Sequence, residues 1–322
     1  MKINQIINIG NWEQRNIQVG YGKRDKIVMK QTKMGKVYFM AKTFDKDIGE
    51  LRSEVCATNL GRLFSFPVQR AWLCRIPQYE QVHLKPYGVI IQIDVRRQSY
   101  AKRNQFRENL VHGAALISSV DPNFSKVKDE QGRRNLYTLT IVIKALRNYV
   151  ANHPNADQLW EQFFELLCFD ALIGGTDRHY NNWGLLEKAD DSSFLRLAPA
   201  FDNGVSLLWN LERYKPTLLN QELQRNFCLK APSMFKKVEG GKFTLYEVLK
   251  ELRSLKELKN SHIVKSVLER LNGITDGAIK SCLSKNIPRN KDFQTAGDEL
   301  KFVYKYVTIR KQLLVEELER LL

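Results

Sequence analysis

The stretch Leu172-Ile-Gly-Gly-Thr-Asp-Arg-His-Tyr-Asn-Asn-Trp-Gly-Leu-Leu186 decides how this chain is interpreted. An apolar run of helical spacing ends at two glycines, a polar loop follows, and a short apolar segment of β type comes next. Asp177 and Asn182 lie five residues apart in the polar loop. The sequence therefore predicts a helix that ends near Gly174-Gly175 and releases a loop that presents both side chains.

A second stretch, Leu197-Ala-Pro-Ala-Phe-Asp-Asn-Gly204, follows at a short distance. Two β-type segments, Trp183-Gly-Leu-Leu and Phe194-Leu-Arg-Leu, flank a polar turn and predict a hairpin between the two stretches. Such a hairpin would return the chain, so that Asp202 faces Asp177 and Asn182 across one metal site. Gly204 is expected to permit the close turn after Asp202.

This set of side chains matches the needs of phosphoryl transfer. That reaction requires a carboxylate that receives the proton of the nucleophile, oxygen ligands for magnesium, and cations on the triphosphate. In protein kinases an aspartate, an asparagine five residues later and a second, later aspartate fill these roles. Carboxylate and amide oxygens are also the ligands that Mg²⁺ prefers. An Asp–Asn spacing alone is common and Asp-Asn-Gly is often a plain turn, so the combination carries the interpretation.

The two stretches together resemble the kinase core of the HipA-like proteins, bacterial serine/threonine kinases that include toxins of toxin–antitoxin systems. The resemblance is closer to short, stand-alone members with Asp-Arg-His in the catalytic loop. It implies an ATP- and Mg²⁺-dependent enzyme that phosphorylates a protein hydroxyl and can autophosphorylate. It also implies Asp177 as catalytic base, with Asn182 and Asp202 as magnesium ligands.

The resemblance assigns roles in the first part of the chain as well. Lys42 resembles the strand lysine that reaches the nucleotide phosphates, and Glu54 resembles its ion-pair partner on the following helix. From the residues alone, Lys42 is a strand-end lysine and Glu54 a helical surface acid. Gly20 and Gly22 could form a loop that covers the phosphates, although a simple hairpin turn explains them equally well.

Three further residues are candidates for the site. Gln92 lies in the strand Val89–Ile93, against which the adenine is expected to bind. Arg178 and His179 lie between the base and the metal ligand, where they could neutralise phosphate charge, assist the base, or support the loop by hydrogen bonds. Both kinds of role stay open for these two residues. Tyr180 and Trp183 are expected to pack within the loop rather than to bind a substrate.

The expected fold is an α+β, two-lobed protein-kinase-like fold. Residues 1–97 form a small β-rich N-lobe that binds the nucleotide phosphates, with a helix over residues 47–64. Its expected strands cover residues 26–30, 37–42 and 87–95, with a turn over 31–36 between the first two and a polar connector over 96–105 after the third. Residues 98–322 form a larger, mainly helical C-lobe that carries the catalytic and metal-binding residues. Apolar spacing predicts helices over 136–150, 157–172, 245–258, 263–271 and 302–322, and the hairpin after the catalytic loop is the one β-type interruption expected among them.

Bulk properties fit a folded chain and leave its partners open. The chain has 322 residues, 43% of them hydrophobic, and no apolar stretch long enough to cross a membrane. The start of the sequence does not read as a signal peptide, and the scattered, odd number of cysteines suits free thiols in a reducing compartment. We therefore expect a cytoplasmic protein of bacterial type, or one delivered into a host cell.

The formal net charge of +16 leaves two alternatives to a protein kinase. One is a phosphoinositide lipid kinase, because Asp-Arg-His also occurs in that distantly related fold and a basic surface suits anionic membranes. The other is a catalytically weak module that binds nucleic acid or a partner protein. The resemblance also implies a small partner protein, which would be either an antitoxin or a protein that supplies an N-terminal subdomain.

Overall fold

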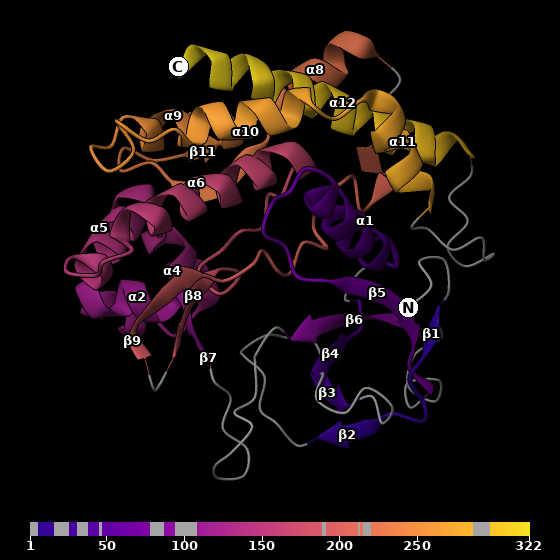
Figure 1. Cartoon of the computed structure of the whole chain (residues 1–322), viewed down its shortest axis with the longest axis horizontal. Coiled ribbons are helices and arrows are strands. Elements are labelled where there is room, and N and C mark those ends of the chain that lie inside the picture. Colours follow the sequence, from indigo (N-terminus) through magenta and orange to yellow (C-terminus); the bar gives the residue numbers. More distant parts are fainter. Residues whose placement is uncertain are drawn as a thin grey trace.

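The computed structural model describes residues 6–15, 26–30, 38–44, 47–77, 87–93, 108–188, 191–211, 213–214, 220–285 and 297–322. Figure 1 shows a β-sheet at one end of the molecule, a layer of helices at the other, and α1 between them. This mixed α+β arrangement, with a small sheet and a larger helical part, confirms the fold class predicted from the sequence.

The first part of the chain forms a six-stranded sheet in the order β1-β5-β6-β4-β3-β2. All neighbouring pairs are antiparallel except β1 and β5, which run parallel. The predicted strands over 26–30, 37–42 and 87–95 are confirmed, and β1, β2 and β5 were not predicted from the sequence. The strand bounds are β1 Ile7–Asn8, β2 Glu13–Arg15, β3 Lys26–Lys30, β4 Tyr38–Lys42, β5 Ala71–Arg75 and β6 Tyr87–Ile93.

Strand alternation decides which way Lys42 points. Successive side chains of a strand face opposite sides of the sheet. Phe39 and Ala41 are buried in a small outer core on one side. Lys42 therefore points to the other side, where its register partner Val89 belongs to the main core with α1.

Helix α1 (Gly49–Leu63) covers the inner side of the sheet and confirms the helix predicted over 47–64. The Asp47 side chain accepts a hydrogen bond from the Gly49 N–H (2.6 Å), which satisfies one of the free donors at the start of the helix. A Cβ at Gly49 would lie 1.9 Å from the carbonyl oxygen of Trp209. Glycine is needed here because the helix start touches the backbone of the segment that follows Asp202.

The larger part of the molecule is built on α6 (Ala156–Ile173), whose second half is almost wholly buried. The predicted helices over 136–150, 157–172, 245–258, 263–271 and 302–322 are all present, with shifted ends; for example, the Thr138 side chain caps α5 and starts it later. The helix bounds are α2 Gly113–Val120, α3 Pro122–Lys126, α4 Glu130–Leu136, α5 Leu139–Val150, α8 Gln221–Leu229, α9 Leu245–Arg253, α10 Ile263–Asn272, α11 Asp276–Lys285 and α12 Gly297–Arg320.

One expectation about this part was wrong, because it contains more β-structure than a single hairpin. The predicted hairpin is present as β8 (Gly184–Lys188) and β9 (Asp191–Leu197), but β7 (Glu108–His112) adds a third strand to it. A second hairpin, β10 (Pro232–Lys236) with β11 (Lys242–Thr244), precedes α9. These strands are short and carry mixed polar and apolar residues, so they give little periodic signal.

Several sequence expectations lie outside the described residues. They are the loop with Gly20 and Gly22, the turn between β3 and β4, and the connector after β6. The domain boundary near residue 97 falls in that connector, so it stays a prediction. The five cysteines form no disulfide with one another; four of them are buried and Cys282 is partly buried.

Candidate active site

Lys42 joins the two parts of the molecule. Its ammonium group lies 2.7 Å from the Glu54 carboxylate on α1 and 2.8 Å from the Asp202 carboxylate, which is 160 residues away in the sequence. Lys42 and Glu54 are buried, whereas 30% of the Asp202 side chain is exposed. Three residues singled out in the sequence thus meet in one ion-pair network at the junction of the sheet, α1 and the segment after β9.

The second oxygen of Glu54 holds the backbone next to Asp202. It accepts a hydrogen bond from the Asn203 N–H (3.1 Å). A Cβ at Gly204 would approach the Glu50 carbonyl oxygen to 3.2 Å, so glycine here allows the chain to lie close against α1. Gly204 therefore permits close packing against α1, whereas the expectation from the sequence was that it permits the turn itself. The positive φ in this turn is found at a different residue.

That residue is Asp202 itself, with φ of +56°. The left-handed region is sparsely populated by residues other than glycine, and aspartate tolerates it better than most. Unusual backbone conformations of this kind are concentrated at functional sites, where the surroundings hold them in place. The Glu54 and Lys42 contacts on either side of Asp202 supply that support.

The loop predicted to carry the catalytic residues, called the catalytic loop below, begins where the sequence predicted. α6 ends at Gly174, which takes the left-handed conformation (φ +66°), and the Gly175 N–H donates to the Asp170 carbonyl oxygen (2.8 Å). Within the loop, the Asn182 side-chain amide and the His179 N–H both donate to the Asp177 carbonyl oxygen (2.8 Å each). The residue pair with five-residue spacing is therefore joined directly, through the backbone of Asp177.

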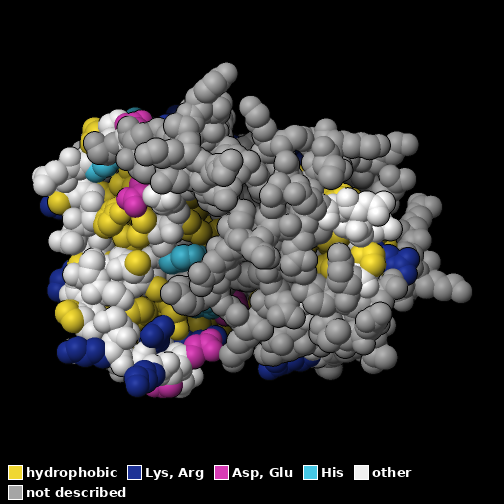
Figure 2. Space-filling view, turned by 90° about the horizontal axis from the view of Figure 1, so that it is seen from below, with side chains coloured by type: hydrophobic (Ala, Val, Ile, Leu, Met, Phe, Trp, Pro, Cys, Tyr) yellow, Lys and Arg dark blue, Asp and Glu magenta, His cyan; other side chains and the backbone are white. Residues whose placement is uncertain are grey.

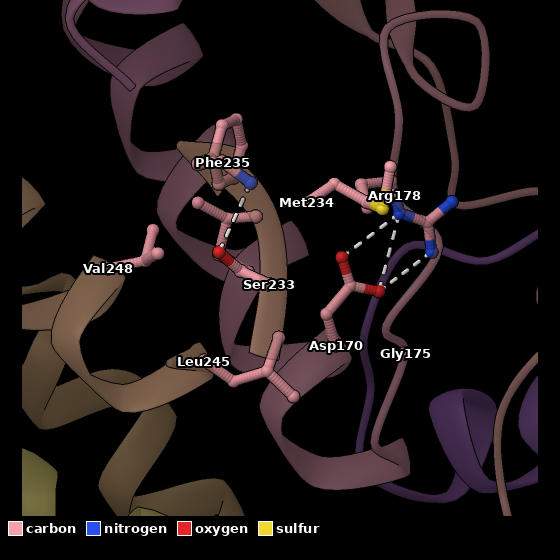
Figure 3. Close-up of a pocket in the computed structure, with 9 residues that line it drawn as sticks. Asp170, Gly175, Arg178, Ser233, Met234, Phe235, Leu245 and Val248 are labelled. Carbon is pink, nitrogen blue, oxygen red and sulfur yellow. Dashed lines mark hydrogen bonds and ion pairs between the residues drawn. The ribbon is translucent and has the colours of Figure 1, made fainter. Parts of the chain in front are cut away.

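Arg178 is buried and fastens the loop to both neighbouring segments. Its Nε and Nη2 donate to the Asp170 carboxylate (3.0 and 2.8 Å), as the dashed lines in Figure 3 mark. Nη1 donates to the carbonyl oxygens of Asn182 (2.9 Å) and Phe201 (2.6 Å), and Nη2 also reaches Asn203 Oδ1 (2.8 Å). These bonds use the five N–H donors of a guanidinium group. Of the two roles left open for Arg178, they favour support of the loop over contact with phosphate.

Arg178 also explains how Asn182 and Asp202 are brought together. One nitrogen binds the Asn182 carbonyl, and the same guanidinium binds Phe201 and Asn203, the two neighbours of Asp202. The anchor for this arrangement is Asp170 on α6. Asp170 and Asn203 were not among the residues predicted from the sequence. Their only signal was a carboxylate within the apolar helix, which has to be paired once it is buried.

Two buried side chains, Tyr137 and Trp183, support the loop through hydrogen bonds. The Tyr137 hydroxyl donates to the Arg178 carbonyl oxygen (3.2 Å), and the Trp183 indole N–H donates to the Tyr137 hydroxyl (2.9 Å). Trp183 and Tyr180 are buried, which agrees with their expected role in loop packing. Asp177 and His179 are only partly buried, so the residues proposed for chemistry lie on the accessible side of this framework.

The charges of the site influence one another. Burial raises the pKa of Asp177, and the Asp202 carboxylate raises it further, against the effect of His179. Burial lowers the pKa of His179, so the imidazole is favoured in its neutral form. The Asn181 N–H donates to His179 Nδ1 (3.2 Å), which leaves the proton on Nε2. Burial acts to lower the pKa of Lys42, but Asp202 and Glu54 outweigh it and raise the pKa, so Lys42 is charged.

The described residues offer few protein ligands for a metal ion. No three His, Cys, Asp or Glu side chains gather in a metal-binding arrangement within the ranges given above. The donor set expected for magnesium, one carboxylate from Asp202 and one amide oxygen from Asn182, fits a hard cation that takes its remaining ligands from phosphates and water. These residues therefore fit a shared protein–nucleotide site rather than a closed protein cage.

The remaining candidates are placed as follows. Gln92 lies on β6, its N–H donates to the Arg70 carbonyl oxygen (2.9 Å), and its side chain is half-buried. Gly20 and Gly22 lie outside the described residues, so their role as a phosphate-covering loop stays a prediction.

The sheet, α1, the catalytic loop and the Lys42 network define the class of kinase-fold proteins. Within that class, the chain belongs to the family of HipA-like C-terminal domains, whose model matches residues 20–227. No curated protein matches the sequence. Among the described residues, none of the helices combines the length and the apolar character needed to cross a membrane.

Solved structures that share the fold include the two that follow. The proinflammatory kinase CtkA of Helicobacter pylori superimposes with a TM-score of 0.70 at 18% identity, over 98% of this chain and 97% of that one. HipA of Shewanella oneidensis MR-1, in a complex with HipB and operator DNA, gives a TM-score of 0.54 at 15% identity, over 97% of this chain and 67% of that one. At these identities the likeness establishes the fold of this chain.

Proposed function

We propose that this chain is an ATP- and Mg²⁺-dependent protein kinase that transfers the γ-phosphate to a serine or threonine hydroxyl. The observation that carries the proposal is the contact of Lys42 with both Glu54 and Asp202. A lysine held between a helix glutamate and a later aspartate is the arrangement in which protein kinases bind the phosphates and their metal. Membership of the HipA-like family supports the same assignment.

The residues of the site divide the reaction between them. Asp177 accepts the proton of the acceptor hydroxyl while the hydroxyl oxygen forms a bond to the γ-phosphorus, and the bond from that phosphorus to the β-phosphate oxygen breaks to release ADP. Lys42 binds the phosphates of ATP through its charged ammonium group. Asn182 and Asp202 would hold Mg²⁺, which neutralises charge on the phosphates when bound. Arg178 positions these groups without touching the substrate.

His179 is assigned a smaller role. Its neutral ring lies next to the Asp177 and Asp202 charges, and its Nε2–H remains for a hydrogen bond to a ligand. We assign it to the binding of the transferred phosphoryl group, where a hydrogen-bond donor stabilises charge that develops in the transition state.

A small protein partner is also proposed. The HipA neighbour is in complex with HipB and operator DNA. A comparable partner would account for part of the net charge of +16, since an acidic or DNA-bound protein binds a basic surface. Co-purification of a partner encoded beside this chain would test it.

The decisive experiment measures transfer of radiolabelled γ-phosphate. Asp177→Ala and Asp202→Asn are expected to abolish transfer to protein acceptors while circular dichroism and the unfolding transition stay close to those of the wild type, because asparagine tolerates the positive φ of residue 202 and still accepts a hydrogen bond from Lys42. Asp191→Ala, on the exposed end of the β8–β9 hairpin, is a matched control that should keep activity. Undiminished transfer by the Asp202 variant would refute the proposal. Incubation with phosphoinositide vesicles in parallel separates a protein acceptor from a lipid one.

A further inference from the structure

The hairpin β10–β11 places two lysines directly opposite each other. Lys236 on β10 and Lys242 on β11 are register partners, so their side chains lie on the same face of the hairpin. Like charges directly opposite each other destabilise a strand pair. Lys237, next in sequence, is paired with Glu247 (3.0 Å), whereas no ion pair joins Lys236 or Lys242 to any residue within the described ranges.

A third cation lies beside them on α4. Arg134 contacts Glu130 through one of its terminal nitrogens, while its Nε is buried without a hydrogen-bond partner. The Arg134 side chain is 36% exposed, so the remaining part of its guanidinium group is open to an acceptor group from solution. The repulsive lysine pair and the exposed part of the Arg134 guanidinium therefore favour an anion bound beside the hairpin.

The hairpin is fixed to the catalytic loop. The Lys236 N–H donates to the Tyr137 carbonyl oxygen (3.0 Å), and the Tyr137 hydroxyl donates to the Arg178 carbonyl oxygen. Figure 3 shows the β10 side chains Ser233, Met234 and Phe235 around a small cavity that Asp170 and Arg178 also line. The lysine pair therefore has a defined position relative to Asp177.

Electrostatic effects show that this position is close to the proposed base. Burial lowers the pKa of Lys242, the charges of Lys236 and Arg134 lower it further, and the Asp177 carboxylate acts in the opposite direction. The Arg134 charge also lowers the pKa of Asp177. Lys242 and Arg134 thus lie within electrostatic range of the Asp177 carboxylate, which would meet the acceptor hydroxyl, and Lys236 lies within range of Lys242.

We propose that Lys236, Lys242 and Arg134 bind an acidic segment of a protein substrate, whose Asp or Glu side chains flank the hydroxyl that is phosphorylated. This inference rests on the proposed kinase function and adds the substrate class. A few carboxylates near the acceptor would remove the repulsion in the hairpin and bind the guanidinium of Arg134, since carboxylates accept charge-assisted hydrogen bonds from both kinds of cation.

The extent of the cluster favours a peptide over a nucleic acid. A nucleic acid presents a regular series of phosphates and is bound by an extended basic surface. Here three cations share one hairpin and one short helix, and Glu130 lies among them. On the described part of the face in Figure 2, basic side chains occur singly or in small groups beside other types, without a continuous tract.

The test uses fluorescence anisotropy with the full chain and three fluorescein-labelled probes. Two are peptides with one serine, flanked by Asp and Glu or by Asn and Gln, and the third is a single-stranded RNA. The acidic peptide is expected to bind at least roughly tenfold more tightly than the neutral one, the scale expected for one or two charge-assisted hydrogen bonds. The double variant Lys236→Gln/Lys242→Gln should lose that difference, and Lys237→Gln, whose charge is already paired, should keep it.

Three outcomes would overturn the inference: equal binding of the two peptides, an acidic preference that survives in the double variant, or hairpin-dependent RNA binding that the acidic peptide does not displace. A separate γ-phosphate transfer assay with the same peptides distinguishes failure of the acidic-substrate inference from failure of the proposed kinase function. Phosphate transfer without a preference for the acidic peptide would agree with the proposed kinase function and would refute binding of an acidic segment by the hairpin lysines. Acidic binding without transfer, together with transfer to no other acceptor, refutes the function.

Discussion

The Arg178 guanidinium shows how one buried side chain can determine the geometry of the site. It ties the catalytic loop to α6 through Asp170 and to the Asp202 segment through Phe201 and Asn203. Asp170 is fully buried, and burial raises its pKa against the opposing effect of Arg178. The pair is therefore costly to create and much more costly to break, because a lone charge would stay in the interior.

Replacement of Arg178 by Met is expected to lower the free energy of unfolding by about 3–5 kcal/mol at neutral pH, the range for breaking a buried ion pair. In the variant the pKa of Asp170 should rise further. A group whose pKa is higher in the folded state favours folding fully below its unfolded pKa and loses that contribution as the pH rises through the folded value. The difference in the free energy of unfolding between the wild type and the variant should thus decrease as the pH falls. Urea denaturation of both proteins at several pH values measures this difference in unfolding free energy. A difference that does not change with pH would contradict this account.

At the scale of elements, α6 and α12 meet at the start of the catalytic loop. Arg310 on α12 is fully buried and donates to the Ala171 carbonyl oxygen (3.0 Å) in the last turn of α6, where a positive charge is favourable. Its guanidinium also lies over the Tyr306 ring, 4.6 Å from the centroid. Gly174 fits between these side chains and α6: a Cβ there would lie 2.0 Å from the Tyr306 hydroxyl.

Gly174→Ala is therefore expected to lower the free energy of unfolding by at least about 1–2 kcal/mol, the cost of a left-handed backbone for an L-residue, before any steric overlap is counted. It should also reduce phosphate transfer, because the loop that carries Asp177 starts there. Combination with Tyr306→Phe removes the closest overlapping atom and should recover part of the loss. Gly277→Ala in α11 is the control: its nearest neighbour is 3.9 Å away, so stability should be unchanged or slightly higher. Equal effects at the two glycines would refute this explanation.

The elements that could be predicted are those whose signal is local. The end of α6 at Gly174 follows from two adjacent glycines, and the antiparallel pair of β3 and β4 follows from two β-type runs with a polar turn between them. β10 and β11 could not be found in this way. Their bulged pairing places Lys236 opposite Lys242, which only the folded chain specifies.

The same reason limits the prediction of the site. Asp177, Asn182 and Asp202 stand in recognisable local patterns, and their roles stay predictions until activity is measured. Asp170 gave only the weak signal of a carboxylate in an apolar helix. Its partner Arg178 is eight residues away along the chain, and its place beside Asn203 depends on the packing of α6 against a distant turn.

At the scale of the whole molecule, the ion-pair network of Lys42 connects the sheet to the helical part. Loss of this ammonium group would leave Glu54 buried next to Asp202 without the cation between them. A parallel bridge between Val68 and Ala200 joins the same two parts of the chain nearby. The proposed nucleotide site therefore lies where the two parts meet, so ligand binding and the stability of the whole fold should be coupled.

Binding of a non-hydrolysable ATP analogue with Mg²⁺ is accordingly expected to raise the melting temperature of the full chain. A ligand that binds only the folded state at 100 times its Kd adds about 2.7 kcal/mol to the free energy of unfolding. Addition of EDTA should remove most of the increase, because Asn182 and Asp202 supply only part of the metal coordination and the phosphates supply the rest. In Asp202→Asn the analogue should give the same small shift with and without Mg²⁺, while Asp191→Asn should respond like the wild type. A shift in the wild type that is unaffected by EDTA would show that the nucleotide binds without the metal, and would remove Asp202 from the proposed magnesium site.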